Sequence, residues 1–192
     1  MRCRAEVASV LRAPEVAAEQ VTQLLFDEPV TLTAEDEGWA LIETAYGYPG
    51  WVERDALDDG VGSLPSRNAG DPLEIARAYV GTPYEWGGLT PRGIDCSGLV
   101  HVAYRNVGLL IPRDSWQQEE EGVPVNEAEL RSGHLVSYGS DMRADHIAFW
   151  SGNGRIFHAT GRDGVRAVVE EFEPEFLRAR RRKFFRIPAN SV

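Results

Sequence analysis

Few residues in this chain could carry out nucleophilic catalysis: two cysteines, Cys3 and Cys96, and four histidines. Cys96 follows a glycine-rich loop and begins a predicted helix, where unpaired backbone N–H groups and the helix dipole favour an anion. A thiol in that position has a lowered pKa and reacts as a thiolate. Cys3 has no such surroundings. We therefore predict that Cys96 is a nucleophile rather than a small buried residue, the usual role of a lone cysteine.

A cysteine nucleophile needs a base within hydrogen-bond reach and a third group that orients the base. His101 lies five residues beyond Cys96 on the same predicted helix, about 140° around its axis, so it cannot face the thiol. His146 and His158 flank a turn at residues 151–154, which indicates two adjacent antiparallel strands. These two histidines are the candidates for the base and its partner.

The length of the loop at this turn decides whether the two imidazoles meet. A two-residue loop, Asn153 and Gly154, would place His146 and His158 on opposite faces of the sheet. A three-residue loop, residues 152–154, would place them on one face as diagonal neighbours, roughly 7–8 Å apart between Cα atoms. We predict the three-residue loop.

Metal binding is the other use of one cysteine and two histidines, since zinc takes such ligands. The sequence has no closely spaced ligand pairs of the kind found in structural zinc sites. A helix start suits a nucleophile better, so we expect neither a metal nor another cofactor.

Two helices are predicted in the middle of the chain. Asp71 can cap the first, which we expect to end at Gly81. The second begins at or near Cys96 and ends at Gly108. Its apolar stripe has helical spacing and consists of Leu99, Val100, Ala103, Tyr104 and Val107.

The rest of the chain reads as short strands separated by turns. Before residue 58 the expected strands are 6–11, 21–26, 30–33, 39–44 and 48–52. In the fourth of these, Trp39 and Leu41 are expected to point inward. After Gly133 the expected strands are 134–138, 146–151, 155–160, 165–172 and 183–187. Strands, then helices, then more strands indicate a small β-barrel or sandwich followed by an α+β domain.

Five segments resemble the NlpC family of bacterial cell-wall peptidases. They are PYEWGG at 83–88, DCSGLV at 95–100, PRDS at 112–115, DHIA at 145–148 and FHA at 157–159. Residues 5–54 resemble a bacterial SH3-like domain. The resemblance implies an α+β fold with a papain-like catalytic domain, its helices packed on an antiparallel sheet, behind a small SH3-like β-barrel. We expect the barrel in residues 1–60, a linker in 61–70 and the catalytic domain in 71–192.

The resemblance also implies roles for individual residues. Cys96 would be the nucleophile, His146 the general base and His158 the residue that orients it. Tyr84 would help to bind the oxyanion through its hydroxyl group. The substrate site would be lined by Trp86, Asp95, Ser97, Arg113, Asp114 and Ser115, with the guanidinium of Arg113 as a clamp for a carboxylate.

An SH3-like domain before an NlpC domain is similar to peptidases that cut between γ-D-glutamate and L-Lys or diaminopimelate. These enzymes require a free N-terminal L-Ala, and their SH3-like domain caps one end of the cleft. A tyrosine and an acidic residue bind the amine, for which Tyr48 and Glu15 are the candidates. We therefore expect a cysteine endopeptidase that acts on murein-derived peptides in recycling. A non-catalytic murein-binding module and an acyltransferase or thioesterase on the same fold remain open.

Composition narrows the partners and the location. The formal charge of −10 and the pI of about 4.9 disfavour nucleic acid as a partner. The sequence has no apolar run near the roughly 18 residues that span a membrane, and it shows no signal peptide, so we expect a cytoplasmic protein. One position departs from the family: His134 stands where an aspartate is usual. We expect it to alter local geometry or stability and to leave the catalytic residues unaffected.

Overall fold

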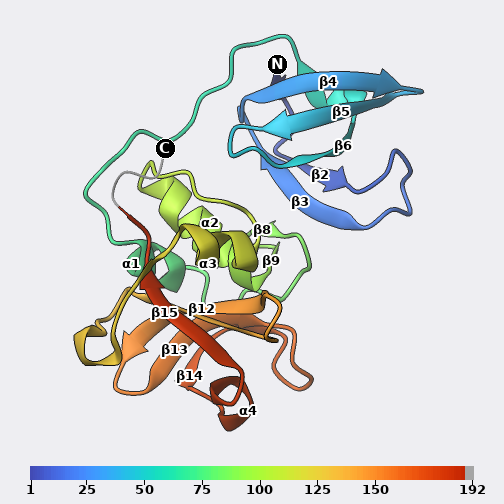
Figure 1. Ribbon diagram of the computed structural model, residues 1–192. Coiled ribbons are helices and arrows are strands. Elements are labelled where there is room, and N and C mark those ends of the chain that lie inside the picture. The colour runs from blue at the N-terminus through green and yellow to red at the C-terminus, as the bar shows by residue number, and fades with distance from the viewer. Residues whose placement is uncertain (189–192) are drawn as a thin grey trace.

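Two large sheets organise the chain, one on each side of a group of helices (Figure 1). The computed structural model describes residues 1–188. Its first sheet has five antiparallel strands in the order β3-β2-β6-β5-β4, which are β2 (Val7–Leu11), β3 (Gln20–Leu25), β4 (Val30–Asp36), β5 (Trp39–Thr44) and β6 (Pro49–Glu53). A two-stranded sheet of β1 (Arg2–Cys3) and β7 (Leu57–Asp58) and a 3₁₀ turn, η1 (Arg54–Ala56), complete this part.

The inward face of β5 is the opposite of the predicted one. Ala40 and Ile42 are fully buried, whereas Trp39 and Leu41 are only partly buried. The alternation was predicted correctly, and the choice of face was wrong. Ala40 and Ile42 pack in a buried cluster with Val10, Leu24 and Val52, and the indole of Trp39 lies outside it.

The segment between the two parts is attached at both ends. The backbone N–H of Ser63 donates to the Asp27 carbonyl at 2.8 Å, and the N–H of Asn68 donates to the Val107 carbonyl at 3.0 Å. The first contact is with the N-terminal part and the second is with the end of helix α2 (Cys96–Asn106). The domain limits at residues 60 and 71 stay a prediction.

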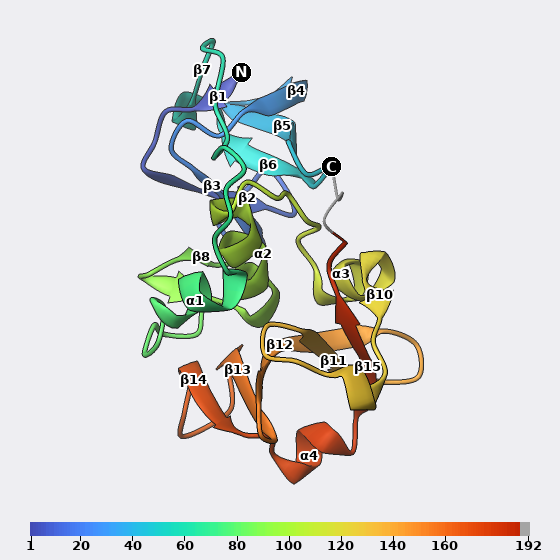
Figure 2. The ribbon, with the colours of Figure 1, turned by 90° about the vertical axis from the view of Figure 1, so that its left-hand side faces the viewer.

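The second sheet has six antiparallel strands in the order β10-β15-β11-β12-β13-β14. They are β10 (Val123–Pro124), β11 (Leu135–Gly139), β12 (Ala144–Gly152), β13 (Arg155–Thr160), β14 (Ala167–Phe172) and β15 (Arg181–Arg186). Helices α1 (Pro72–Arg77), α2 (Cys96–Asn106) and α3 (Ser115–Glu121) lie between this sheet and the N-terminal strands in both ribbon views (Figures 1 and 2). This is the predicted α+β arrangement behind an SH3-like part.

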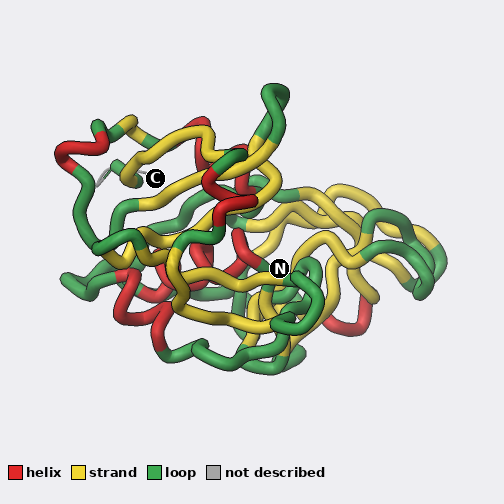
Figure 3. Tube along the Cα trace, turned by 90° about the horizontal axis from the view of Figure 1, so that it is seen from below, coloured by secondary structure: helices red, strands yellow, loops and turns green. Residues whose placement is uncertain are grey.

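Four short elements connect the larger ones. They are the β8–β9 pair (Leu89–Thr90 and Gly93–Ile94), the 3₁₀ turn η2 (Glu127–Glu129) and α4 (Glu175–Arg178). Strands account for more of the chain than helices do (Figure 3).

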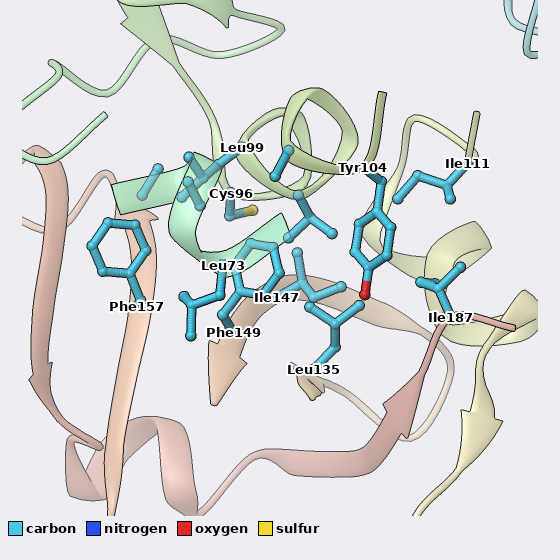
Figure 4. Close-up of a cluster of buried hydrophobic side chains, with 14 of the residues drawn as sticks. Leu73, Cys96, Leu99, Tyr104, Ile111, Leu135, Ile147, Phe149, Phe157 and Ile187 are labelled. Carbon is cyan, nitrogen blue, oxygen red and sulfur yellow. The ribbon is translucent and has the colours of Figure 1, made fainter. Parts of the chain in front are cut away.

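Helix α2 packs its apolar stripe against the six-stranded sheet. Leu99 from the helix and Ile147 and Phe149 from β12 belong to one buried cluster, and Cys96 lies at its edge near the start of α2 (Figure 4). The predicted start of this helix is confirmed. The nucleophile candidate therefore sits where the helix meets the central strands.

The other helices agree less well with the predictions. Asp71 caps α1 as predicted, because its side chain accepts from the backbone N–H of Leu73 at 2.9 Å, but the helix ends at Arg77 rather than at Gly81. Helix α3 was not predicted, since it buries little apolar surface. Its sequence signal is a capping box, in which the Gln117 side chain accepts from the backbone N–H of Asp114 at 3.1 Å.

Candidate active site

Cys96 is the first residue of α2 and is 7% exposed. The preceding residue, Asp95, caps the helix by accepting from the backbone N–H of Gly98 at 2.6 Å. The backbone N–H groups of Ile147 and Ser97 lie near enough to the Cys96 sulfur to favour its charged form. The thiol therefore lies against β12, beside the residue that follows His146.

The thiol is not acidic in this arrangement. Burial raises the pKa of Cys96 to about 12, and the nearby Asp95 carboxylate acts in the same direction. The two backbone N–H groups and the Arg113 charge oppose this rise and do not cancel it. The predicted lowering of the pKa at a helix start is wrong, because desolvation of the sulfur outweighs the helix terminus. The thiol must lose its proton to a base during the reaction.

His146 and His158 meet as predicted. His146 Nε2 lies 2.7 Å from His158 Nδ1, and the ring centroids are 5.0 Å apart. The two residues stand on neighbouring strands in which Phe149 pairs with Phe157. This register places both imidazoles on one face as diagonal neighbours.

The turn that sets this register differs from the predicted one. Asn153 and Gly154 form a two-residue loop, with φ angles of 53° and 74°, as a type I′ turn requires. The register shifts by one residue between Trp150 and Gly152, which places Ser151 in a β-bulge. The predicted pairing is confirmed and the predicted loop length is wrong, since the extra residue lies in the strand.

His146 is a neutral base with one nitrogen left for the thiol. Burial lowers its pKa to about 3, with His158 as the next cause and Arg180 after it. Its Nε2 is bonded to His158, so Nδ1 is the atom that remains to accept a proton.

Tyr84 lies close enough to the sulfur for their charges to interact. Burial raises the pKa of Tyr84 above its ordinary value, and the Cys96 charge is the next cause. The ring packs against the buried cluster that contains Cys96, and Gly161 approaches its edge. The hydroxyl is therefore neutral and can donate a hydrogen bond, as the role at an oxyanion requires.

A cavity of about 380 Å³ opens over the thiol, between the two parts of the chain. Six predicted site residues line it besides Cys96: Tyr48, Trp86, Asp95, Ser97, Asp114 and Ser115. The residues that sequence reasoning missed are Arg12, Glu19, Val21, Trp116, Arg143, Ala144 and Asp145. Asp145 begins the DHIA motif at 145–148, whereas no motif marks the other six, which only the tertiary fold brings to the cavity.

Comparison with known families assigns this arrangement. The model of the NlpC/P60 family matches residues 81–181, and the model of the bacterial dipeptidyl-peptidase SH3 domain matches residues 10–57. The chain belongs to the NlpC/P60 family. Its N-terminal part is a bacterial dipeptidyl-peptidase SH3 domain.

Individual relatives agree with this family. A probable endopeptidase of Corynebacterium glutamicum is 40% identical over 98 residues, which are 50% of this chain and 46% of the relative. The gamma-D-glutamyl-L-lysine dipeptidyl-peptidase of Bacillus cereus is 34% identical over 99 residues, which are 50% of this chain and 30% of the relative. The matches thus span about half or less of each relative.

A solved structure shares the architecture over nearly the whole chain. The crystal structure of an NlpC/P60 family protein from Bacillus cereus superposes with a TM-score of 0.58 and 23% identity, and it covers 97% of this chain and 62% of that one. This likeness shows that the fold is shared across both parts.

Arg113 does not serve as a clamp for substrate in this NlpC/P60 chain. It is 1% exposed, and its donors are taken within the protein. They reach Thr22 Oγ1 at 3.0 Å, both Asp95 oxygens at 2.9 and 2.7 Å, Ser97 Oγ at 2.9 Å and the Gly88 carbonyl at 3.5 Å. The predicted clamp is wrong because the Arg113 guanidinium already binds the Asp95 carboxylate. Its partner is the cap of α2.

Glu15 is not part of the site. It is exposed and does not line the cavity, whereas Glu19 does. Glu19 accepts from Trp86 Nε1 at 2.9 Å and from Arg12 Nε at 2.8 Å. The prediction of Glu15 is wrong, since the pairing of β2 with β3 brings the acid four residues later to the cleft.

Tyr48 reaches the cavity from the SH3 part, as predicted. Its hydroxyl donates to the Asp114 carboxylate at 3.2 Å. Burial, with Asp114 as the next cause, raises the pKa of Tyr48 to about 12. The tyrosine is thus a neutral donor that links the two parts at the rim of the cavity.

His134 forms a local hydrogen bond in the turn before β11. Its Nδ1 accepts from the backbone N–H of Arg131 at 3.1 Å, as a carboxylate oxygen could. It lies at the start of β11 and does not line the cavity.

Residues 1–188 lack two further features, a metal-binding cluster and a membrane-spanning helix. They contain no group of three or more His, Cys, Asp or Glu side chains that could hold a metal ion. In the same range, no helix has the length and apolar character needed to cross a membrane.

Proposed function

We propose that this protein is a cysteine peptidase that cuts murein-derived peptides after γ-D-glutamate, before L-Lys or diaminopimelate. One observation carries the proposal. The Cys96 thiol lies beside the strand that carries His146, which is bonded to His158, and it lines a cavity that the SH3 part closes on one side through Arg12, Glu19 and Tyr48.

The geometry supports a two-step acyl transfer. His146 Nδ1 takes the thiol proton as the Cys96 sulfur attacks the γ-carbonyl carbon of D-Glu. The Tyr84 hydroxyl and the Cys96 backbone N–H receive the developing oxyanion. His146 then gives its proton to the amine of the departing diamino acid, and the C–N bond breaks. Water, activated by the same imidazole, hydrolyses the thioester and restores the thiol.

The charges along the cavity fit both ends of L-Ala-γ-D-Glu. The carboxylates of Glu19 and Asp114, with the Tyr48 hydroxyl, suit the ammonium group of a free L-Ala. Arg143 lines the same cavity and has no hydrogen bond or ion pair with any other described residue. Its guanidinium can therefore bind the α-carboxylate of D-Glu in a bidentate manner.

The closed side favours short peptides with a free N-terminus over stems that are still attached to glycan. This fits a role in recycling murein peptides. The proposed location is the cytoplasm, where thiols stay reduced, and both Cys3 and Cys96 are free.

Mass spectrometry on L-Ala-γ-D-Glu-diaminopimelate tests the proposal. The wild type should release L-Ala-D-Glu and diaminopimelate, Cys96→Ala should release nothing, and N-acetylation of the L-Ala should suppress cleavage. An intact peptide with the wild type contradicts the proposal. If Cys96 then also fails to react with iodoacetamide, the protein is a binding module. Accumulation of a transfer product with an added amine assigns an acyltransferase.

A further inference from the structure

The partner of His146 has a partner of its own. His158 Nε2 lies 3.1 Å from Glu171 Oε1, and Arg162 Nη2 donates to Glu171 Oε2 at 3.0 Å. His158 is 1% exposed, and its ring is held between His146 at Nδ1 and Glu171 at Nε2. Glu171 lies on β14, beyond the five family motifs of the sequence.

The register between β13 and β14 places Glu171 beside His158. His158 pairs with Val169 across β13 and β14, so Glu171, two residues on, projects from the same face as a diagonal neighbour. Glu170, the next residue back, projects from the other face, where it pairs with Arg77. Two adjacent carboxylates of one strand therefore have different surroundings.

Glu171 is ionised at neutral pH. The hydrogen bond to His158 is the largest of the causes that lower its pKa to about 2, and the bond to Arg162 acts in the same direction. An ionised carboxylate only accepts hydrogen bonds, so the hydrogen between Glu171 and His158 belongs to the imidazole Nε2.

This single proton position determines the others when both rings are neutral. A neutral His158 with hydrogen on Nε2 has a bare Nδ1, which can only accept. The hydrogen in the 2.7 Å contact must then come from His146 Nε2, which leaves His146 Nδ1 bare. That bare nitrogen is the atom required to take the proton of the thiol.

We propose that Glu171, held by Arg162, is a positioning residue that fixes the tautomers of both histidines and stabilises the imidazolium formed at His146. The inference rests on the proposed function, because these tautomers matter for catalysis only if His146 takes the proton of the Cys96 thiol. The proton positions themselves can be measured without any substrate.

Glu171→Gln is the decisive variant, because the amide keeps the shape and can donate to His158 Nε2. Donation from Gln would shift hydrogen to Nδ1 of both rings and leave His146 with no acceptor for the thiol. A tautomer error next to a catalytic base costs about 10⁴-fold in kcat in a known protease. Because Glu171 contacts His158 and not the base itself, we expect a smaller loss of about 100-fold in kcat, with a nearly unchanged KM. The matched control is Glu170→Gln, which should retain activity.

Nitrogen-15 NMR of histidine-labelled protein reads the tautomers directly. The wild type should show His146 and His158 neutral with hydrogen on Nε2, and Glu171→Gln should show both with hydrogen on Nδ1. A wild-type signal for a charged His158, or for His146 with hydrogen on Nδ1, overturns the inference. So does a Glu171→Gln variant with unchanged tautomers or an unchanged kcat.

Two further measurements keep the outcomes separate. If Glu171→Gln unfolds, Arg162→Met tests the same link, with an expected loss of about 10-fold in kcat, and wild-type turnover in that variant counts against the proposal. If the peptide is not cut by the wild type, the proposed function fails while the NMR result still decides the proton positions. The rate of Cys96 alkylation by iodoacetamide then replaces kcat.

Discussion

The two walls of the cavity are held together by different means. The wall with Cys96 comes from the start of α2, which shares one buried core with β12 and β13, the strands that carry His146 and His158. The opposite wall, with Glu19 and Tyr48, belongs to the SH3 part and is held by hydrogen bonds across the boundary. Under the proposed function, the first wall performs the chemistry and the second selects the substrate. Variants on the two walls should therefore fail in different ways.

The largest effect is expected on the catalytic wall. His146→Ala removes the base, and loss of a base of this kind costs up to about 10⁶-fold in kcat in a known protease. We expect a loss of at least about 10³-fold in peptide cleavage with a largely unchanged KM, measured by chromatography of the released amine. His134→Ala is the control, since that imidazole does not line the cavity. Turnover by His146→Ala within a few fold of the wild type would show that His146 is not the base.

A large effect on stability is expected at a buried ion pair of the NlpC/P60 part, Arg113 with Asp95, whose arginine also reaches Thr22 of the SH3 part. Arg113→Met leaves the Asp95 carboxylate buried without its cation, which costs about 3–5 kcal/mol in comparable cases. We expect the free energy of unfolding to fall by that amount in urea titration.

The control for Arg113 is an exposed arginine, Arg92, whose ion pair crosses the boundary to the SH3 part. Arg92 and Glu6 are 3.0 Å apart, with side chains 65% and 82% exposed. Arg92→Gln should change stability by less than about 1 kcal/mol. Equal effects of the two variants would show that burial does not decide the strength of these ion pairs.

The substrate-selecting wall should respond in KM. Tyr48→Phe removes the hydroxyl that donates to Asp114, and a hydrogen bond to a charged group contributes about 1.5–3 kcal/mol. We expect KM for a peptide with free L-Ala to rise about 10-fold, and discrimination against the N-acetylated peptide to shrink, with kcat nearly kept. A loss of kcat at constant KM would assign Tyr48 to the chemical step and not to substrate binding.

The two walls also differ in how far sequence could predict them. The helix start at Cys96 and the strand alternation around His146 and His158 are local patterns, so the catalytic wall was predicted in outline. The bulge at Ser151 has no local signal, yet it keeps the predicted register. Glu171 was missed because its role depends on pairing between β13 and β14.

The errors concern effects that need three dimensions. The pKa of Cys96 depends on burial, which a helix start does not reveal. Arg113 has the chemistry of a carboxylate clamp, but only the fold shows that Asp95 already occupies it. Nothing in the local sequence distinguishes Glu15 from Glu19, and only the fold shows that Glu19 lines the cavity.

The smallest expected effect concerns pH and tests the buried histidines apart from catalysis. Burial lowers the pKa of His101, with its Nδ1 bound to the Ile111 carbonyl, from 6.5 to about 3. The unfolded chain binds the proton more readily, so this contribution to stability is full above pH 6.5 and is lost as the pH falls toward 3. We expect the free energy of unfolding to decrease over that range, and to decrease less steeply in His101→Gln. Since His101 packs against Tyr46 of the SH3 part, an identical slope in the variant would mean that this ring is not held neutral at the boundary.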